Sequence, residues 1–399
     1  MRNNSWFANI LIISTICFLG VYIFGCSVTQ GGSNPFINYN VPAGEVHLYR
    51  GSSLTQVSTG NTALKTAVES SQDNDLILVG SGNYQAGSEI TISTDLTIQA
   101  ANNTSPNNVI IDGEDTYRLF NIPTGRTITF KKITMFDGKS IRGSAIYNNS
   151  SQVTLEECIV TSNRGWIIDA SSTGGAIYNT GGSLTIQDCI FSNNFAQLSG
   201  GAIMNTSIAQ NYCYNSTFKN NNAPGDSSAV NCGGGAIFCS DNTQLTCTGN
   251  TFENNQSLGG GKGGAIFLAQ NSTFTCHYNT YTGNKGTQSG GAIFQKDGVF
   301  QGSNNTFTAN TAVNWGGAIY ITGSNYTSSY NTFIGNVSNI SAGGLFCKDG
   351  TGFSSNFDTF NGNTSGVCPH VYARYITTQQ VLNGVTLINP TSITCAIAN

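Results

Sequence analysis

Short runs in which apolar and polar residues alternate make up most of this chain. In "NSTFTCHYNTY", Phe274, Cys276 and Tyr278 are separated by polar residues, which is the pattern of a β-strand that turns one side toward a core. Such runs differ from an amphipathic helix, whose apolar residues recur every three or four positions. The pattern predicts many short strands whose apolar residues, Tyr278 included, face inward.

The strands recur with a regular spacing that two apolar positions mark. The first marker belongs to a glycine-rich motif such as "GGAIY", at Ile146, Ile177, Ile203, Ile237, Ile266, Ile293, Ile319 and Leu345. Successive first markers are 31, 26, 34, 29, 27, 26 and 26 residues apart. The second marker follows 14 or 15 residues later, at Val160, Phe191, Phe218, Phe252, Tyr281, Phe307, Phe333 and Phe360. A motif that returns in this way is a building unit, because a catalytic site is needed only once.

An asparagine stands three residues after every second marker. These residues are Asn163, Asn194, Asn221, Asn255, Asn284, Asn310, Asn336 and Asn363. A repeat of about 26 residues with short alternating runs matches one coil of a parallel β-helix. Stacked coils place the asparagines in one ladder, in which each amide bonds its copy in the next coil and nearby turn backbone. We also expect these asparagines to adopt the left-handed backbone of a corner, and the paired glycines to form another corner where a Cβ is costly.

The predicted fold class is all-β: a parallel β-helix, or solenoid, with an N-terminal capping helix. In "NTALKTAVES", Ala63, Leu64, Ala67 and Val68 have helical spacing, and Asn61 stands at the N-cap position. We expect this helix to plug the N-terminal mouth and to hide an unpaired strand edge. The chain then divides into a signal peptide (1–26), a linker and lead-in (27–60), the capping helix (61–72), N-terminal coils (73–142), regular coils (143–363), and a degenerate C-terminal coil and cap (364–399).

The first residues have the order of an export signal. Arg2 precedes an apolar run from Ile10 to Gly25, and Cys26 and a polar stretch follow, as in a secretory signal. The end of the run, "IFGC", resembles a bacterial lipobox, so Cys26 is the predicted lipid attachment site. The alternatives are an ordinary cleaved signal and an uncleaved anchor of 16 apolar residues, which is short for a bilayer.

Composition and charge exclude several classes of protein and partner. With 48 glycines and 9% charged residues, helix bundles and coiled coils are disfavoured, because both need long stretches of charged helix formers. The net charge is -4 and Lys and Arg do not cluster, so nucleic acid is not an expected partner. His47, His277 and His370 lie far apart in the repeat, so we predict neither a metal site nor a cofactor.

The repeat varies in length between the ladder asparagine and the next glycine pair. The longest insertions span residues 164–173 and 222–233. Variable loops on a repeating scaffold are typical of a binding face, so these loops are where we first expect contact with a partner. Trp166 and Trp315 are the candidate ligand contacts in such loops; the alternative is that they pack over glycine-lined corners.

The positions of the cysteines favour buried free thiols over a network of disulfides. Cys213, Cys247 and Cys276 fall in one column of consecutive coils. Their parallel Cβ directions disfavour the disulfide dihedral, so we expect buried free thiols. In an oxidising compartment, the better disulfide candidates are Cys232 with Cys239 and Cys368 with Cys395.

The two motifs together resemble the repeat of the chlamydial polymorphic outer-membrane proteins and related surface proteins. GGA[ILV] occurs as "GGAIY", "GGAIM" and "GGAIF", FxxN occurs as "FSNN", "FKNN", "FENN" and "FTAN", and the pair covers residues 143–363. The resemblance implies a single-stranded right-handed β-helix of the pectate-lyase-like type. It also implies an exported, adhesin-like protein at the cell surface, the outer membrane or outside the cell, with a surface protein or glycan of a host or neighbouring cell as its partner.

The competing hypothesis is an enzyme, because right-handed β-helices often carry polysaccharide lyases and hydrolases. Glycoside hydrolysis needs two carboxylates at a fixed separation, and a lyase needs a positioned base. Most acids of the regular coils stand alone, and the densest group, Asp112, Glu114 and Asp115 in "IDGED", also suits a turn. We therefore predict binding without catalysis and assign no catalytic residue; the alternative is a polysaccharide lyase or glycoside hydrolase.

Overall fold

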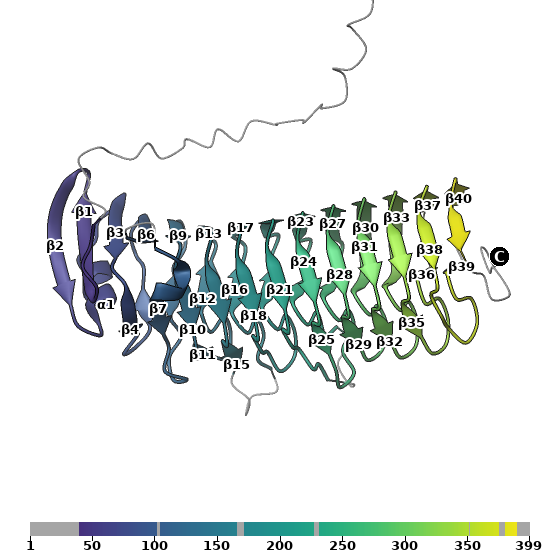
Figure 1. The fold of residues 1–399 in the computed structure, drawn as a ribbon, viewed down its shortest axis with the longest axis horizontal. Coiled ribbons are helices and arrows are strands. Elements are labelled where there is room, and N and C mark those ends of the chain that lie inside the picture. Colours follow the sequence, from purple (N-terminus) through teal and green to yellow (C-terminus); the bar gives the residue numbers. More distant parts are fainter. Residues whose placement is uncertain are drawn as a thin grey trace, which may run out of the picture.

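Stacked coils form a β-solenoid of the right-handed type along the long axis of the molecule (Figure 1). The structure is a computed structural model, and it describes residues 40–101, 104–165, 171–226, 231–350, 352–374 and 380–388. Strands of successive coils pair in parallel and in register, for example Ile146 with Ile177 and Phe191 with Phe218. The prediction of a parallel β-helix is therefore confirmed.

One parallel sheet of 12 strands contains the second apolar markers, and we call it the Phe sheet. Its strands, one in each coil, are β4 (Gly82–Gln85), β7 (Val109–Asp112), β10 (Thr134–Phe136), β14 (Ile159–Thr161), β18 (Ile190–Ser192), β21 (Thr217–Lys219), β24 (Thr251–Glu253), β28 (Thr280–Thr282), β31 (Thr306–Thr308), β34 (Thr332–Ile334), β38 (Thr359–Asn361) and β41 (Thr386–Ile388).

A second sheet of 23 strands forms two columns. The Ile column, which contains the first markers, comprises β5 (Ile90–Thr91), β8 (Phe120–Ile122), β12 (Ile146–Asn149), β16 (Ile177–Thr180), β19 (Ile203–Thr206), β22 (Ile237–Cys239), β26 (Ile266–Leu268), β36 (Leu345–Lys348) and β39 (Val371–Arg374). The middle column comprises β1 (Glu45–Arg50), β2 (Ser53–Thr59), β3 (Asp75–Val79), β6 (Leu96–Ala100), β9 (Thr127–Lys131), β13 (Gln152–Glu156), β17 (Ser183–Gln187), β20 (Gln210–Tyr214), β23 (Gln244–Thr248), β27 (Ser272–His277), β37 (Gly352–Asn356) and β40 (Gln380–Asn383). Two long strands, β30 (Ile293–Ser303) and β33 (Ile319–Ser329), run through both columns.

Very short strands line the turns between the Phe sheet and the Ile column. They form one pair, β11 (Lys139–Ser140) with β15 (Arg164–Gly165), and one group of four, β25 (Gln256–Ser257), β29 (Lys285–Gly286), β32 (Thr311–Ala312) and β35 (Val337–Ser338). The variable loops begin after these strands, so the insertions extend outward from a regular corner.

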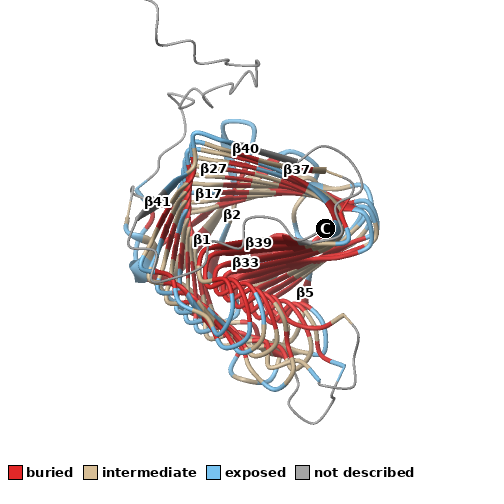
Figure 2. Ribbon diagram, turned by 90° about the vertical axis from the view of Figure 1, so that its right-hand side faces the viewer, coloured by how far each residue is buried: buried red, intermediate tan, exposed pale blue. Residues whose placement is uncertain are grey.

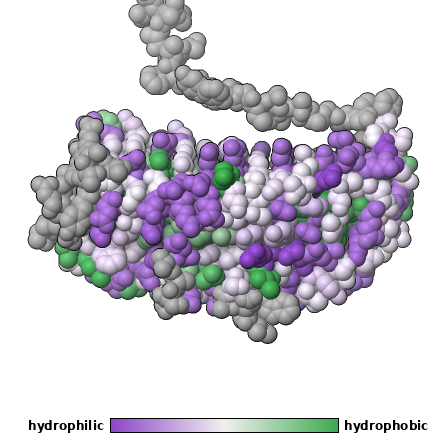
Figure 3. All heavy atoms as spheres, turned by 180° about the vertical axis from the view of Figure 1, so that it is seen from behind, coloured by the Kyte–Doolittle hydropathy of each residue, from purple (hydrophilic) through white to green (hydrophobic). Residues whose placement is uncertain are grey.

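The core runs the length of the solenoid and is lined by the two marker columns. Buried residues line the inner side of the coils in the end-on view (Figure 2). In the Phe sheet, Phe191, Phe218, Phe252, Tyr281 and Phe307 are fully buried, and consecutive rings stack with centroids 4.7–5.0 Å apart. Each such ring contributes about 1.5–3 kcal/mol by leaving water. The outer surface in Figure 3 is mostly hydrophilic to intermediate, and hydrophobic residues on it form separate small patches.

The glycine pair serves two different purposes at the corner before the Ile column. Gly316 has a φ of +62°, a left-handed backbone that favours glycine. Gly317 instead lies against the next coil, where a Cβ would be 2.3 Å from the carbonyl oxygen of Gly343. The first glycine of the motif thus turns the chain, and the second lets the coils stack closely.

The N-terminal end differs from the prediction of a capping helix. Helix α1 (Ala63–Glu69) is shorter than the predicted range of 61–72, and a 3-10 turn, η1 (Pro106–Asn108), is the other described helical segment. The antiparallel hairpin β1–β2, within the segment predicted to be a lead-in, covers the edge of strand β3. The helix therefore does not hide that strand edge, because main-chain hydrogen bonds from β1 already pair it.

The N-cap of this helix also differs from the prediction. Thr62, not Asn61, is the N-cap residue, and no side chain caps the helix. The side chain of Asn61 donates instead to Gln85. Helix α1 is held by burial of Ala63, Leu64, Ala67 and Val68, the apolar residues that indicated it in the sequence.

The cysteines are mostly free thiols in the core. Cys213, Cys247 and Cys276 lie in register in one buried column and are free, so this prediction is confirmed. Burial raises the pKa of Cys239 to about 12.

The predicted disulfide Cys232–Cys239 is wrong, since neither cysteine is in a disulfide. The Cys232 thiol donates to the backbone oxygen of Asp226 in the loop before the glycine corner, whereas Cys239 lies in the core after that corner. Cys368 is in a disulfide, and Cys395, its predicted partner, lies outside the described residues.

Candidate functional site

The eight predicted ladder asparagines form one buried column. In the middle of it, the Asn284 side-chain nitrogen donates to the side-chain oxygen of Asn310 and to the carbonyl of Phe252, both at 2.9 Å. The backbone N–H of Asn284 also donates to the Asn310 side-chain oxygen, at 3.0 Å. The same amide-to-amide bond joins every neighbouring pair of the ladder residues from Asn163 to Asn363. The column is structural, because its polar groups are buried and bonded to one another.

The expectation that these asparagines adopt the left-handed backbone is wrong by one residue. The positive φ falls on the preceding position, which is occupied by Ser162, Asn193, Asn220, Asn254, Gly283, Ala309, Gly335 and Gly362. The ladder residue follows the bend and turns its side chain inward. Asparagine is required there because its amide both donates and accepts a hydrogen bond in each coil.

Two further ladders support the other two corners of the coil. The column two residues before the second marker contains Asn250, Asn279, Asn305, Asn331 and Asp358, joined by bonds of the same type. Another ladder, which was not predicted from the sequence, joins Asn148, Asn179 and Asn205 in the Ile column. The signal for it was an asparagine two residues after the first marker in "IYNN", "IYNT" and "IMNT".

The other predicted site residues are placed only in part. Cys26 and Trp166 lie outside the described residues. Trp315 is 36% exposed, and its ring centroid is 6.2 Å from that of Tyr320 and 6.3 Å from that of Phe346. It therefore packs on aromatic residues of the Ile column beside the glycine corner while keeping one edge in solvent. A ligand contact at Trp315 remains a prediction.

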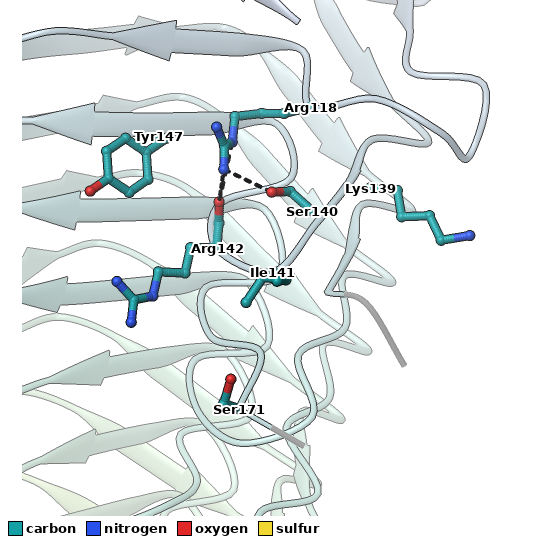
Figure 4. Close-up of a pocket in the computed structure, with 7 residues that line it drawn as sticks. All are labelled: Arg118, Lys139, Ser140, Ile141, Arg142, Tyr147 and Ser171. Atoms are coloured by element: carbon teal, nitrogen blue, oxygen red, sulfur yellow. Dashed lines mark hydrogen bonds between the residues drawn. The ribbon is translucent and has the colours of Figure 1, made fainter. Parts of the chain in front are cut away.

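An open pocket of about 550 Å³ lies near the N-terminal end, beside the first variable loop (Figure 4). The residues that line it are Arg118, Lys139, Ser140, Ile141, Arg142, Tyr147 and Ser171. Strands β11 and β12 and the turn between them supply most of these residues. The described lining contains three cations, two serine hydroxyls, a tyrosine and no carboxylate.

Arg118 holds the pocket wall together. Its guanidinium donates to the Ser140 hydroxyl at 2.8 Å, to the backbone oxygen of Gly143 at 3.0 Å and to that of Arg142 at 3.1 Å, and it pairs with Glu89 (Figure 4 shows the bonds to Ser140 and Arg142). Its guanidinium carbon lies 5.1 Å from the ring centroid of Tyr147. With its donors engaged in this way, Arg118 fixes the shape of the site.

The charge of Lys139, the second cation of the pocket, is neutralised by an acid of the "IDGED" turn. Lys139 lies 3.3 Å from Asp115, and Arg164 pairs with the same carboxylate. The hydrogen bond from Arg164 is the main cause that holds the pKa of Asp115 below its usual value, against the opposing effect of burial. Burial and the nearby charge of Asp115 raise the pKa of Asp137. Asp115 thus neutralises the neighbouring cations. Within the described residues, no group of three or more His, Cys, Asp or Glu could hold a metal ion.

Arg142 differs from four other arginines of the described structure. Arg50, Arg118, Arg126 and Arg164 each meet a carboxylate within 4.0 Å, and Arg142 meets none among the described residues. Its guanidinium carbon lies 5.4 Å from the ring centroid of Tyr178, and that ring stacks on Tyr147 with centroids 5.5 Å apart and planes 1° apart. A guanidinium has five N–H donors and prefers a carboxylate or phosphate. The pocket therefore offers an exposed cation, held over an aromatic pair, to an anionic group.

This pocket was not predicted from the sequence. The residue before the glycine corner is Arg142 in one coil but Thr173 and Ser199 in the next two. A departure from the repeat at one position was thus the available signal. It was weak, because only the stacked coils bring Arg142 beside Tyr178 and show that the nearby acids already have partners.

The family comparison agrees with the repeat found in the sequence. The chain carries Chlamydia polymorphic membrane protein repeats. The matched residues are 188–206, 215–240, 251–269 and 306–322, all within the regular coils. No curated protein matches the sequence. Within the described part of the chain, no helix has both the length and the apolar character needed to cross a membrane.

Solved structures with a similar arrangement are enzymes that act on polysaccharides. One is the catalytic domain of an α-1,3-glucanase in complex with nigerose, at 12% identity and a TM-score of 0.46, covering 86% of this chain and 66% of that one. An alginate lyase has 11% identity and a TM-score of 0.43, covering 82% and 81% of the two chains. The A-module of a mannuronan C-5 epimerase from Azotobacter vinelandii has 10% identity and a TM-score of 0.37, covering 83% and 95%. These similarities concern the solenoid fold.

Proposed function

We propose that this chain is an exported protein, displayed at the cell surface, that binds an anionic group of a surface protein or glycan on a host or neighbouring cell. The observation that carries the proposal is Arg142, which lacks a carboxylate partner among the described residues and lines the pocket. The role is adhesin-like and needs no catalysis. The repeats of the polymorphic membrane protein type support a surface location.

The chemistry of the lining supports binding in preference to cleavage. A glycoside hydrolase needs a pair of carboxylates flanking the bond that is cut, and the described lining of this pocket contains none. Asp115 and Glu89 lie nearby, but each is paired with the cations that shape the wall. A pocket built from an arginine, hydroxyls and an aromatic ring can hold and orient an anion.

Cell binding by purified protein tests this function. Binding of the chain without residues 1–26 to intact cells is measured by biolayer interferometry for wild type, Arg142→Gln and Lys285→Gln. Lys285 is the matched control, because it is another exposed cation that forms no ion pair with the described residues. We expect about a ten-fold loss of affinity for Arg142→Gln, since a charge-assisted hydrogen bond contributes about 1.5–3 kcal/mol, and little change for Lys285→Gln. Equal affinity of wild type and Arg142→Gln would overturn the pocket as the binding site.

Two further assays test the absence of catalysis and the anchor. Incubation with a panel of acidic polysaccharides should leave the chains intact; cleavage that disappears when a single acid is replaced would establish the enzyme instead. Metabolic acyl labelling should mark the wild-type protein and not Cys26→Ala. Labelling that survives this substitution, or is absent from the wild type, would rule out the lipid anchor.

A further inference from the structure

A row of exposed aromatic side chains lies on the opposite half of the molecule from the pocket. Tyr278, Tyr330 and Phe357 occupy the same position in three of four consecutive coils, with Asn304 between the first two. Each of the four residues follows a strand of the middle column. The next residue belongs to the second buried ladder, and a strand of the Phe sheet begins after it. We call Tyr278, Asn304, Tyr330 and Phe357 the corner ridge.

The backbone at the corner ridge is unfavourable for aromatic residues. All four residues have left-handed backbones, with φ between 56° and 57°, a region in which bulky side chains are rare outliers and Asn or Gly is preferred. Other coils follow that preference at the same corner, with Asn215, Gly249 and Gly384. The corners at Tyr278, Tyr330 and Phe357 therefore carry backbone strain that the corners with Asn or Gly avoid.

Burial does not compensate this cost. The exposed fractions of Tyr278, Tyr330 and Phe357 are 64%, 57% and 46%. Tyr330 and Phe357 stack on each other with centroids 5.1 Å apart, whereas Tyr278 has no ring contact among the described residues. The alternating pattern predicts that Tyr278 faces inward with Phe274 and Cys276, and that prediction is wrong, because the strand ends at His277. Strain held at exposed aromatic side chains points to a binding role.

The surface around the corner ridge is uncharged. On one side lie His277, Ser303, Ser329 and Asn356, and on the other lie Thr280, Thr306, Thr332 and Thr359. Burial lowers the pKa of His277, and its ring contacts the Ser303 hydroxyl at 2.6 Å. Lysine, arginine, aspartate and glutamate are absent from the adjoining strand segments, which are residues 272–277, 298–303, 324–329 and 352–356 of the middle column and strands β28, β31, β34 and β38.

From this combination we infer that the corner ridge binds a neutral linear glycan. The apolar C–H face of a sugar ring packs on an exposed aromatic ring, and its hydroxyls can bond to the flanking Ser, Thr and Asn side chains. Tyr278 and Tyr330 are two coils, or about 10 Å, apart along the axis, a span that about two consecutive sugar rings occupy. Single-stranded nucleic acid also stacks on aromatic residues, but it needs a positively charged groove, which these strand segments lack.

The N-terminal coils show that this corner can be built without aromatic residues. There the same position is occupied by Lys132 and Glu157, which form an ion pair at 3.4 Å, and by Asp188. A glycan site is thus confined to the coils from Tyr278 to Phe357. It does not depend on the anion pocket, which lies in other coils.

Asparagine substitutions test the inference without endangering the fold. Tyr278→Asn, Tyr330→Asn and Phe357→Asn, singly and together, place at each corner the residue that occurs at Asn215 and Asn304. Because the new residue tolerates the left-handed backbone better, we expect an unchanged or raised Tm. Binding of cellohexaose and maltohexaose, measured by isothermal titration calorimetry and saturation-transfer NMR, should be detectable for wild type and fall at least ten-fold in the triple variant.

Two control variants show whether sugar binding depends on the corner ridge itself. Tyr212→Asn removes a surface tyrosine of strand β20 outside the ridge, and Arg142→Gln removes the cation of the anion pocket; both should bind the hexasaccharides like wild type. The inference is overturned if wild type binds neither hexasaccharide, or if the triple variant binds them equally well. Ridge-dependent binding of phosphatidylcholine vesicles or of oligo-dT, without binding of sugars, would also overturn it and assign the aromatic residues to a membrane or to nucleic acid.

Discussion

The N-terminal coils and the C-terminal coils of this solenoid use the same geometry but join successive coils by different interactions. Nine of the eleven ion pairs in the described structure involve residues of the range 45–164, and the other two join adjacent residues, Lys296–Asp297 and Lys348–Asp349. The amide ladder begins at Asn163 and runs to Asn363. The interaction that joins successive coils thus changes from exposed ion pairs to buried amide hydrogen bonds at about the point where the regular repeat begins.

This contrast shows that one set of residues fixes how the coils stack in register, and that a different set determines the chemistry of the outer surface. Exposed ion pairs are worth little, so the charged coils depend mainly on their apolar core, and their surface charges shape the anion pocket. In the C-terminal coils the buried amides fix one coil on the next. Their outer positions are then free to carry the uncharged strand segments and the aromatic corner ridge.

The largest effect should come from breaking the amide ladder in its middle. Asn284→Ala removes the partners of the Asn255 amide and of the Phe252 carbonyl. Each buried polar group left unsatisfied costs about 1–3 kcal/mol, so we expect the free energy of unfolding to fall by about 3 kcal/mol in urea denaturation. Gln301→Ala removes an amide at an exposed strand position; it is the control and should change this free energy by less than about 0.5 kcal/mol. Equal effects of the two substitutions would show that the ladder is not what holds these coils.

A smaller effect is expected from the close approach of coils at the glycine pair. In Gly291→Ala, the new Cβ would be 1.9 Å from the carbonyl oxygen of Gly317, so the two coils must separate, at a cost of about 2 kcal/mol. Gly335→Ala is the matched variant, because its φ is +60° and nothing lies within 4 Å of the new Cβ. It should cost about 1 kcal/mol, from backbone strain alone. Thermal unfolding of both variants measures the difference; a larger loss in Gly335→Ala would contradict the close contact.

The acid at the end of the second ladder should make the C-terminal coils sensitive to pH. Burial raises the pKa of Asp358, although Ser328, Ser355 and Asn331 donate hydrogen bonds to it. The folded protein therefore holds this proton more tightly than the unfolded chain, and stability falls as pH rises from the unfolded pKa through the raised folded pKa. Asp358→Asn should abolish this dependence and raise the free energy of unfolding at neutral pH, because asparagine occupies the same column at Asn331. Urea titrations at several pH values test this; a variant less stable than wild type at neutral pH would contradict it.

The smallest effect is expected from an ion pair of the N-terminal coils. Lys131 lies 2.8 Å from Glu156, and each side chain is 34% exposed. We expect Lys131→Ala to lower the free energy of unfolding by about 0.5 kcal/mol at low salt and by less at high salt, because salt screens exposed charges. A loss that matched that of Asn284→Ala and persisted at high salt would remove the contrast between the two halves.

Much of the regular part of the fold could be predicted from single columns of residues. The spacing of Ile177, Ile203 and Ile237 and of Phe191, Phe218 and Phe252 indicated the coil and its register. These predictions succeeded because each coil solves the same packing problem, so an inward position carries the same kind of residue in every copy. The N-terminal hairpin β1–β2 was missed because it occurs once and follows no repeat.

The candidate sites were harder to predict because they depend on departures from the repeat. Arg142 and Tyr178 are 36 residues apart in the sequence but meet in neighbouring coils. Tyr278 continued the alternation of its strand in the sequence, yet the corner turns it outward. Its direction depends on where the strand ends, which the apolar pattern alone does not show.

The coil, its length, its inward columns and the amide ladder followed from the amino-acid sequence alone, because one local pattern recurs at a regular period. Only the folded molecule settled that Arg142 stands without a carboxylate partner among the described residues, which corner residue takes the left-handed backbone, and which strand edge the hairpin covers. The first outcome depends on neighbours one coil away, about 26 or more residues distant in the chain. Stacking creates these contacts, so no single stretch of sequence contains them.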